Sequence, residues 1–254
     1  MTFVCDHSAM LNDGAPSSGP AAATADLRLS PIQRSPARAR ASDWVFGELR
    51  SAIRDLRLAP GTWISEIDLT SMLQVSRTPV REAIARLADV GLVQVVPQVG
   101  TRVALISLSA VEQARFVREA VELAAFETAC SLPVRDVHAL RDLLVTQRQA
   151  QQDDDIDAFF VADEAFHQQI FTLAGYPDVW EGIQQMKIQL DRLRRLSLPD
   201  PANLENLIRE HQLIVEALEA GDVAEGRNRV SAHARRIRDD APGVKSARPG
   251  YFSP

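Results

Sequence analysis

Residues 75–84 read VSRTPVREAI, and this order of residue types predicts a helix that begins near residue 76. Ser76 or Thr78 can cap the helix by accepting a backbone N–H bond, and Pro79 suits its first turn, where a missing donor costs nothing. Apolar residues then recur at spacings of four and three, at Val80, Ile84 and Leu87. The stretch therefore predicts a capped amphipathic helix with one buried face.

The N-terminal end of this helix carries polar side chains that suit DNA. Arg77, Thr78 and Arg81 lie off the apolar face and point outward. An arginine can hold guanine through its two major-groove acceptors, while the free N–H groups of the helix start and the hydroxyls of Ser76 and Thr78 suit phosphate oxygens. A capped helix with solvated arginines is the alternative, and the flanking elements favour the DNA-reading interpretation.

The flanking sequence supplies the other parts of a winged helix-turn-helix, in the order that such a domain requires. Helices are predicted over about 43–59, 65–73 and 76–90, and strands over 92–96 and 101–105. Pro60-Gly61 ends the first helix, and the turn at 97–100 joins the strands into a hairpin. We therefore expect residues 41–106 to form a DNA-binding domain whose third helix reads the major groove.

The remaining sequence divides into a leader, a helical region and a tail. Residues 1–40 are rich in Ala, Ser and Pro without periodic apolar positions, which predicts a disordered leader. Helix signals and Pro or Gly breaks predict six further helices, at about 109–131, 134–151, 155–174, 178–197, 202–220 and 222–239. We expect a mostly α protein: a winged helix-turn-helix, then an antiparallel six-helix bundle over 107–240 and a flexible tail over 241–254.

Composition sets the class of protein. The chain has 254 residues, of which 46% are hydrophobic and 24% charged, with a formal net charge of −6. This fits one or two soluble domains and excludes collagen-like and fully disordered chains. The two cysteines, Cys5 and Cys130, suggest neither a disulfide framework nor a CxxC site, and we find no membrane span or signal peptide pattern. A cytoplasmic location is expected.

Four potential metal ligands fall on apolar helix faces. At 100° per residue, Asp163, His167 and His211 lie in the middle of apolar stripes, and His233 lies near the edge of one. A buried charge without a partner is costly, and groups four residues apart can reach one ion. A satisfied core histidine or a His–Asp pair explains any one of them. Together they favour a divalent metal, with Zn as first choice among Zn, Ni, Mn and Fe.

Arginines on the predicted bundle helices invite two interpretations. Arg118 shares a helix face with small residues and can hold a carboxylate through two parallel hydrogen bonds, so we take it as the candidate effector contact. An ion pair with Glu122, one turn on, is the equal alternative. Arg192, Arg194 and Arg195 are expected to form a solvated basic face, and the alternative is that one of them reaches the effector cavity.

Three segments, taken in order, resemble the DNA-binding domain of GntR-family transcription regulators. They are Pro60-Gly61 with the helix after it, VSRTPVREA at 75–83, and GTRV at 100–103. The resemblance implies that Arg77, Thr78 and Arg81 contact operator DNA and that the wing tip at Gly100 approaches the minor groove. Gln74 stands where the family often has Gly, which predicts a strained or slightly shifted turn before the reading helix.

The metal-ligand set is similar to a pattern in the FCD domain, which follows the DNA-binding domain in the FadR branch of this family. Its metal-binding members show Asp-x-x-x-His and two later histidines, here Asp163, His167, His211 and His233. Six bundle helices resemble the VanR-like subgroup. The resemblance implies a homodimer on a palindromic double-stranded operator, and a small carboxylate effector beside the metal. An arginine on the first bundle helix, here Arg118, often contacts that effector in related regulators.

The function expected is that of a ligand-responsive transcription regulator, a repressor that senses a small organic acid. The alternative from another class is a metal-dependent hydrolase or lyase that uses the same ligands, with Glu164 or Glu210 as base. Each glutamate adjoins a ligand in sequence and so lies about 100° around the helix from it. No GxSxG, HExxH, P-loop or GxGxxG motif occurs. We therefore expect no enzymatic activity.

Overall fold

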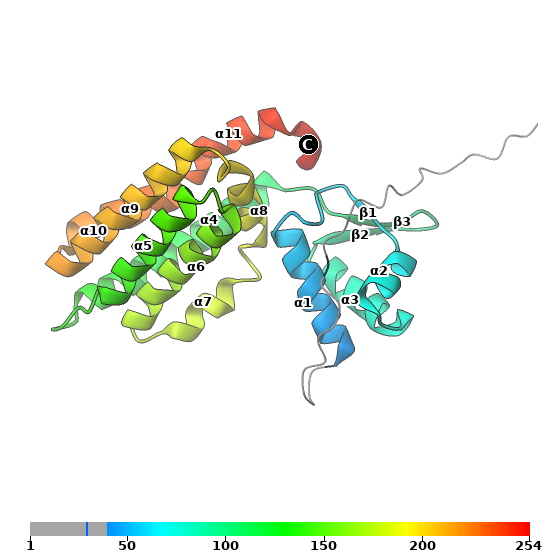
Figure 1. Cartoon of the computed structure of the whole chain (residues 1–254), viewed down its shortest axis with the longest axis horizontal. Helices are drawn as coiled ribbons and strands as arrows, with labels where there is room; N and C mark the ends of the chain where they lie inside the picture. The colour runs from blue at the N-terminus through cyan, green and yellow to red at the C-terminus, as the bar shows by residue number, and fades with distance from the viewer. Residues whose placement is uncertain (1–28, 30–39) are drawn as a thin grey trace, which may run out of the picture.

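A computed structural model describes Leu29 and residues 40–254. Figure 1 shows two lobes, a smaller one with helices around a sheet and a larger helical one. The predicted disordered leader falls almost entirely outside the described residues. Within the described part, no helix combines the length and the apolar character that a membrane span requires.

The smaller lobe is the predicted winged helix-turn-helix. Its elements are α1 (Ala41–Arg54), β1 (Trp63–Ile64), α2 (Glu66–Leu73), α3 (Arg77–Asp89), β2 (Val93–Val96) and β3 (Gly100–Val103). The strands pair antiparallel in the order β1-β3-β2, with Val93 opposite Val103. β1 was not predicted because two residues are too few to show an alternating pattern.

The apolar helix faces of this lobe meet in one core. Its fully buried members include Leu49, Ile53, Leu69, Val80 and Leu87. Ile188, from the larger lobe, packs into the same core. Gln74 ends α2 in the left-handed conformation, with φ 54°, which is the strain that the departure from Gly predicts.

Five long helices of the larger lobe lie within a few residues of their predicted positions. They are α4 (Leu108–Cys130), α5 (His138–Gln152), α6 (Ile156–Leu173), α9 (Pro201–Ala220) and α10 (Val223–Arg235). Four of them begin at a Ser or Asp whose side chain accepts a backbone N–H bond, as Ser107 does for α4 and Asp155 for α6. Such caps are start signals that a sequence shows directly.

The prediction of one helix over 178–197 is corrected. The segment forms α7 (Pro177–Ile183) and α8 (Ile188–Ser197), and the chain changes direction between them. α7 packs on α6, whereas α8 packs on α4, on α1 and on the C-terminal helix. A single straight helix could not make both sets of contacts, and apolar spacing alone does not register the change of direction.

The prediction of a flexible tail over 241–254 is also corrected. α11 (Ile237–Ala247) follows α10 after one residue, and Phe252 beyond it is buried. Phe252 forms a parallel bridge with Ile106, and the Ser253 N–H donates to the Ile106 carbonyl at 2.9 Å. Burial of this aromatic side chain orders a segment that its composition alone suggests is loose. Residues 108–247 therefore contain eight helical segments where six were predicted.

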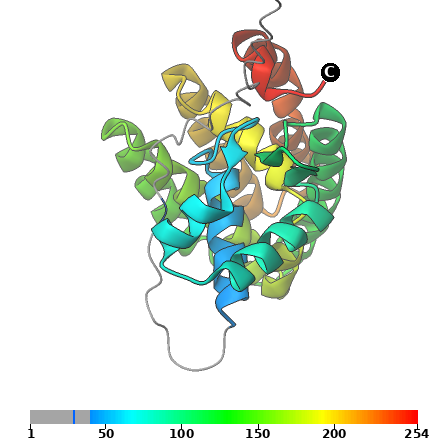
Figure 2. The same cartoon turned by 90° about the vertical axis from the view of Figure 1, so that its right-hand side faces the viewer.

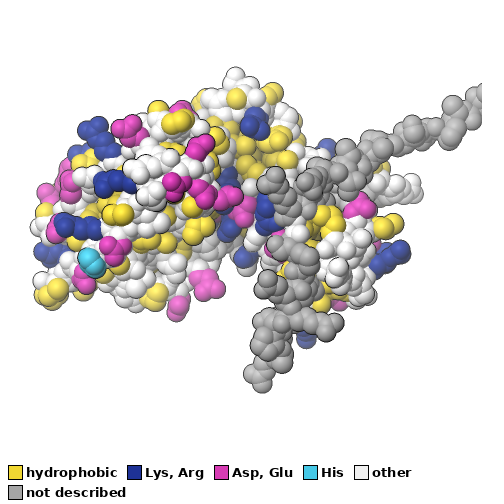
Figure 3. All heavy atoms as spheres, in the orientation of Figure 1, with side chains coloured by type: hydrophobic (Ala, Val, Ile, Leu, Met, Phe, Trp, Pro, Cys, Tyr) yellow, Lys and Arg dark blue, Asp and Glu magenta, His cyan; other side chains and the backbone are white. Residues whose placement is uncertain are grey.

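The two lobes meet at α8 and at the short link between β3 and α4. In Figure 2 the smaller lobe faces the viewer, with the helices of the larger lobe behind it. Figure 3 shows acidic and basic side chains next to one another at the junction. Charged groups therefore occupy the region through which the lobes are connected.

Candidate metal and effector site

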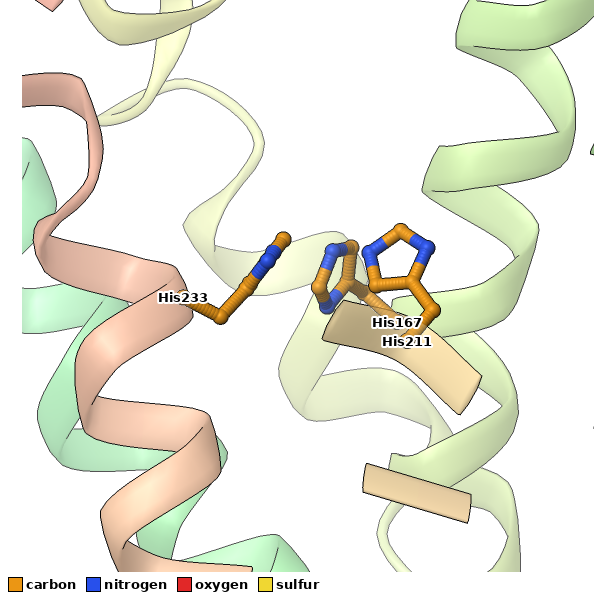
Figure 4. Close-up of side chains that lie close together, drawn as sticks. All are labelled: His167, His211 and His233. Atoms are coloured by element: carbon orange, nitrogen blue, oxygen red, sulfur yellow. The ribbon is translucent and has the colours of Figure 1, made fainter. Parts of the chain in front are cut away.

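Three histidines from three helices meet inside the larger lobe. His167 on α6, His211 on α9 and His233 on α10 point toward one another (Figure 4). One nitrogen from each lies within 4.8 Å of the others, and all three side chains are buried. The fold therefore brings together residues that are up to 66 positions apart in the sequence, as their places on apolar helix faces predicted.

Asp163 completes the group from one turn before His167. Its side chain is fully buried, with Oδ2 3.8 Å from His167 Nε2 and Oδ1 3.7 Å from His211 Nε2. The spacing of four on α6 places both side chains on the same face. All four residues of the predicted metal set thus lie at one place.

Outer hydrogen bonds orient two of the imidazoles. His211 Nδ1 lies 2.9 Å from Gln147 Oε1, and His233 Nδ1 lies 2.9 Å from Glu210 Oε2. Because both oxygens accept, each Nδ1 is the protonated nitrogen, and the lone pair sits on Nε2. Metal-binding histidines are usually held in this way through the ring nitrogen that faces away from the metal.

His167 lies between a carboxylate and an indole. Its Nδ1 is 3.3 Å from Glu122 Oε2, and its ring stacks on Trp180 with 5.6 Å between centroids. Trp180 itself is buried. These contacts direct Nε2 of His167 toward the other ligands.

Three buried atoms of the group lack a hydrogen-bond partner among the described residues. They are His167 Nδ1, which faces Glu122 without bonding to it, Asp163 Oδ1 and His211 Nε2. Buried polar atoms nearly always have a partner, so an orphaned oxygen and nitrogen 3.7 Å apart require an explanation. A divalent ion would satisfy both, and the donor set of imidazoles and carboxylate suits such an ion.

The protonation states also fit a metal. Burial holds the pKa of His167 well below its usual value, and the Arg118 guanidinium adds to the effect. Burial likewise lowers the pKa of His211. Burial alone would raise the pKa of Asp163, yet Arg194 and the two imidazoles outweigh it and hold that pKa far below its usual range. His167 and His211 are thus held as neutral imidazoles and Asp163 as an ionised carboxylate, the forms that bind divalent metals.

Arg118 makes the predicted alternative ion pair and also reaches the ligands. Its Nε donates to Glu122 at 2.5 Å, while its Nη2 lies 2.6 Å from His167 Nε2 and 3.3 Å from His233 Nε2. A guanidinium only donates, so both Nε2 atoms accept from it. The lone pairs that it occupies are the ones that a metal would need.

A small cavity adjoins the histidines. It has a volume of about 30 Å³ and is lined by Arg118, Arg194, Arg236 and His233, among others. A volume of this order holds about one water molecule. A wider cleft of about 380 Å³ lies between α8, α9 and α11 and shares Asn203 and Arg236 with the cavity. The cleft thus gives an approach from the surface to a site lined by three arginines.

The prediction of a solvated basic face on the helix of Arg192, Arg194 and Arg195 is corrected, because all three are buried. Arg194 donates to Asp163 Oδ2 and, at 2.9 Å, to Glu164 Oε1. The arginines are covered because α8 lies between the two lobes. A helix wheel shows which residues share a face, but it does not show what covers a polar face.

The glutamates considered as catalytic bases are engaged elsewhere. Glu164 accepts from Lys187 at 2.7 Å as well as from Arg194. Glu210 accepts from His233 and, at 2.7 Å, from Arg236. Glu210 therefore orients a ligand and does not point at the centre of the site. Sequence reasoning missed this role, although its position one residue before His211 was noted.

The residues predicted to contact DNA lie at the exposed end of the smaller lobe. Arg77 and Thr78 are exposed at the start of α3, and Ser76 precedes them without a side-chain cap bond. Arg81 is also exposed, and its Nε donates to Glu66 at 2.8 Å. Glu66 belongs to the stretch that carries the family resemblance, but its pairing with Arg81 was not predicted, because nothing in the sequence shows that α2 begins beside Arg81.

The wing tip lies on the other side of a groove from α3. The groove has a volume of about 590 Å³ and is lined by Arg77, Arg81 and Gly100, among others. Gly100 has φ 144°, a conformation that other residues rarely adopt. The groove therefore lies between the two parts that the sequence assigns to DNA.

Comparisons with known proteins cover both lobes. Residues 41–103 match the family model described as bacterial regulatory proteins of the gntR family, and residues 113–236 match the FCD domain. An uncharacterized HTH-type transcriptional regulator in an unstable DNA locus of Streptomyces ambofaciens is 39% identical over 82% of this chain and 88% of its own length. The HTH-type transcriptional repressor RspR of Escherichia coli K12 is 31% identical over 91% of this chain and 99% of its own.

A solved structure shares the arrangement of the two lobes. E. coli McbR/YncC superposes with a TM-score of 0.67 at 23% identity, over 83% of this chain and 99% of that one. At this identity the likeness concerns the fold alone. It supports the mostly helical architecture with a small sheet in the N-terminal wing.

Proposed function

Because the chain belongs to the GntR family of bacterial transcription regulators, with an FCD domain after its DNA-binding domain, we propose that it is a repressor that responds to a small organic acid. The chain is a transcription regulator and not an enzyme, and repressors occur among its relatives. One observation carries the sensing proposal: one ring nitrogen from each of three histidines and a carboxylate converge beside an arginine-lined cavity.

The proposed metal ligands are Asp163, His167, His211 and His233. Three imidazoles and one carboxylate suit Zn, Ni, Mn or Fe, and Zn is the first choice. Bound here, the ion would act as a Lewis acid that attracts an effector carboxylate. Four protein ligands leave positions for that carboxylate on an ion that takes five or six ligands.

Arg118 is the proposed effector contact, and its present hydrogen bonds suggest when it becomes available. The Nε2 lone pairs of His167 and His233 accept from Arg118, and the same lone pairs cannot also bind a metal. Arg118 must therefore release the two Nε2 lone pairs when a metal binds. It keeps Glu122 and lines the cavity, where its freed N–H groups can hold a carboxylate.

The proposed DNA contacts are Ser76, Arg77, Thr78, Arg81 and Gly100, within a DNA-binding domain over 41–106. The region from 107 to 240 would bind metal and effector and hold two copies together. A homodimer places two reading helices on the half-sites of a palindromic operator, about one helical turn apart. The protein would act in the cytoplasm, where its DNA is. The effector would change the fit of the dimer to the two half-sites.

The metal proposal is tested by His167→Ala, with His138→Ala as the matched control. The side chain of His138 is 82% exposed and lies on α5, away from the cluster. We expect His167→Ala to lose bound metal in elemental analysis and to lose its response to carboxylic acids, while its affinity for DNA from its own upstream region is kept. Full metal occupancy in His167→Ala would refute the assignment.

The DNA proposal is tested by Arg81→Ala, with exposed Arg209→Ala on α9 as the control. Arg81 is exposed, so its loss should leave the melting temperature unchanged. We expect operator binding to vanish in a gel-shift titration and the salt dependence of any residual binding to weaken. Unchanged operator affinity in Arg81→Ala would remove α3 as the reading helix.

A further inference from the structure

The charged side chains of α8 are unusually well buried. Arg192 and Asp191 are fully buried, Arg194 and Arg195 are at most 9% exposed, and Lys187 at the helix start is 1% exposed. Burying charge without a partner costs several kcal/mol per ion. Each of these groups is therefore expected to have a hydrogen-bond or ion-pair partner. The positions of those partners show which parts of the protein α8 connects.

Side chains on one side of α8 contact the candidate metal site. Arg194 donates to Asp163 Oδ2, while Oδ1 of the same carboxylate is the orphaned atom that faces His211. Lys187 pairs with Asp191 at 2.6 Å and with Glu164, which Arg194 also contacts. The two oxygens of Asp163 thus face two different partners, the ligand cluster and α8.

Side chains on the other side of α8 contact the DNA-binding domain. Arg195, next to Arg194, lies 3.1 Å from Asp55 Oδ1, and Asp55 is the residue that ends α1. Its guanidinium also lies over the Phe160 ring, 4.0 Å from the centroid. Ile188, on the first turn of α8, packs into the core of the smaller lobe.

A third contact reaches the link between the lobes. Arg192 Nη2 donates to the Ala104 carbonyl at 2.7 Å, just after β3 ends. Three arginines within four positions of one helix therefore bind a candidate metal ligand, the link and the end of α1. No other helix among residues 40–254 makes contacts of all three kinds in the hydrogen bonds and ion pairs described.

We propose that Arg194 and Arg195 are positioning residues that make α8 the connection through which the metal site acts on the DNA-binding domain. The inference rests on the proposed metal site. A cation at Asp163 Oδ1 and the Arg194 cation at Oδ2 share one negative charge, so each weakens the attraction of Asp163 for the other. A weaker hold on Arg194 frees α8 to move, and Arg195 carries that movement to Asp55. Metal binding and the DNA-bound arrangement are then coupled reciprocally.

The experiment measures two affinities for each variant of the full chain. Zn²⁺ affinity is measured by titration against a chelating dye, and operator affinity by fluorescence anisotropy with and without saturating Zn²⁺. For the wild type we expect Zn²⁺ to change the operator Kd by about 5-fold or more, the lower end of common coupling factors. Arg209→Gln, exposed on α9, is the matched control and should behave like the wild type.

Substitutions of the two arginines should affect the Zn²⁺ affinity and the operator affinity differently. Arg195→Gln should keep the Zn²⁺ affinity but reduce the Zn²⁺ effect on the operator Kd to less than about 2-fold. Asp55→Asn removes the same ion pair from the other lobe, together with the pair that Asp55 makes with Arg54 within that lobe, and should give the same result, which covers the case in which Arg195→Gln fails to fold. Arg194→Gln should bind Zn²⁺ more tightly, because the cation that shares Asp163 is gone, and should also lose the Zn²⁺ effect.

The failures are distinguishable. A wild-type protein that binds none of Zn²⁺, Ni²⁺, Mn²⁺ and Fe²⁺ overturns the proposed metal site, and this inference with it. A wild type that binds Zn²⁺ without any change in operator affinity overturns the coupling alone. Full Zn²⁺ effects in folded Arg195→Gln and Asp55→Asn would show that the lobes communicate by another route.

Discussion

Replacing Gly226 with alanine tests how closely α10 must approach α4. A Cβ at Gly226 would lie 2.0 Å from two carbons of the Phe126 ring. This is about 1.5 Å inside the contact distance of carbon atoms. Phe126 is fully buried and cannot swing away, so the helices must separate or the ring must tilt. His233 lies two turns beyond Gly226 on the same helix and would move with it.

The magnitude follows from two opposing effects. Overpacking of a core costs about 1–3 kcal/mol, and the upper part of that range, about 2–3 kcal/mol, is expected for an overlap of this size. Alanine in place of glycine stabilises a helix by about 1 kcal/mol. The expected net loss of about 1–2 kcal/mol lowers the melting temperature by about 2–8 °C. Displacement of His233 should also weaken metal binding by about tenfold or more, as changes around a metal ligand commonly do.

The assay pairs thermal unfolding with a metal titration, and Gly182→Ala is the matched control. Gly182 lies in α7, and a Cβ there would meet nothing within 4 Å. Gly182→Ala should therefore keep or slightly raise the melting temperature and leave metal affinity unchanged. If Gly226→Ala melts like the wild type and binds metal equally well, α10 does not need its close approach to α4.

Two further perturbations test the effector contact and the C-terminal segment. Arg118→Met, made together with Glu122→Gln so that no carboxylate is left buried without its cation, should bind metal several-fold more tightly by calorimetry but lose its response to acids. Weaker metal binding in that double variant would contradict the idea that Arg118 competes for the imidazoles. Phe252→Ala removes a buried ring and should lower the free energy of local unfolding of the C-terminal segment by about 3 kcal/mol. The Ser253 amide should then exchange hydrogen roughly 100-fold faster by mass spectrometry, and unchanged protection would show that the bridge to Ile106 does not depend on the ring.

Much of the fold could be predicted because its helices show their buried faces in the sequence. The apolar spacing and the Ser or Asp caps predicted α4, α6, α9 and α10 to within a few residues. The same periodicity placed Asp163, His167 and His211 on buried faces, since a polar residue in an apolar stripe stands out. The buried face of each helix is visible from the residues of that helix alone, so these positions could be predicted from a single sequence.

The rest could not be predicted because it depends on contacts between elements. Arg194 and Arg195 look solvated on a helix wheel, yet they are buried because a second lobe covers α8. The composition of the last residues suggests a flexible end, yet Phe252 forms a bridge with Ile106, more than a hundred positions earlier. For Arg118, both interpretations hold in part, because one guanidinium is long enough to pair with Glu122 and reach two histidines.

The indole of Trp180, stacked on His167, provides a built-in optical reporter. An ion bound by that imidazole would sit close enough to alter the emission of the indole, and a paramagnetic ion would quench it. Trp44 and Trp63 lie in the other lobe, so their replacement by phenylalanine would leave a single fluorophore at the site. Ligand occupancy could then be followed in real time, without a label, while the same sample binds its operator.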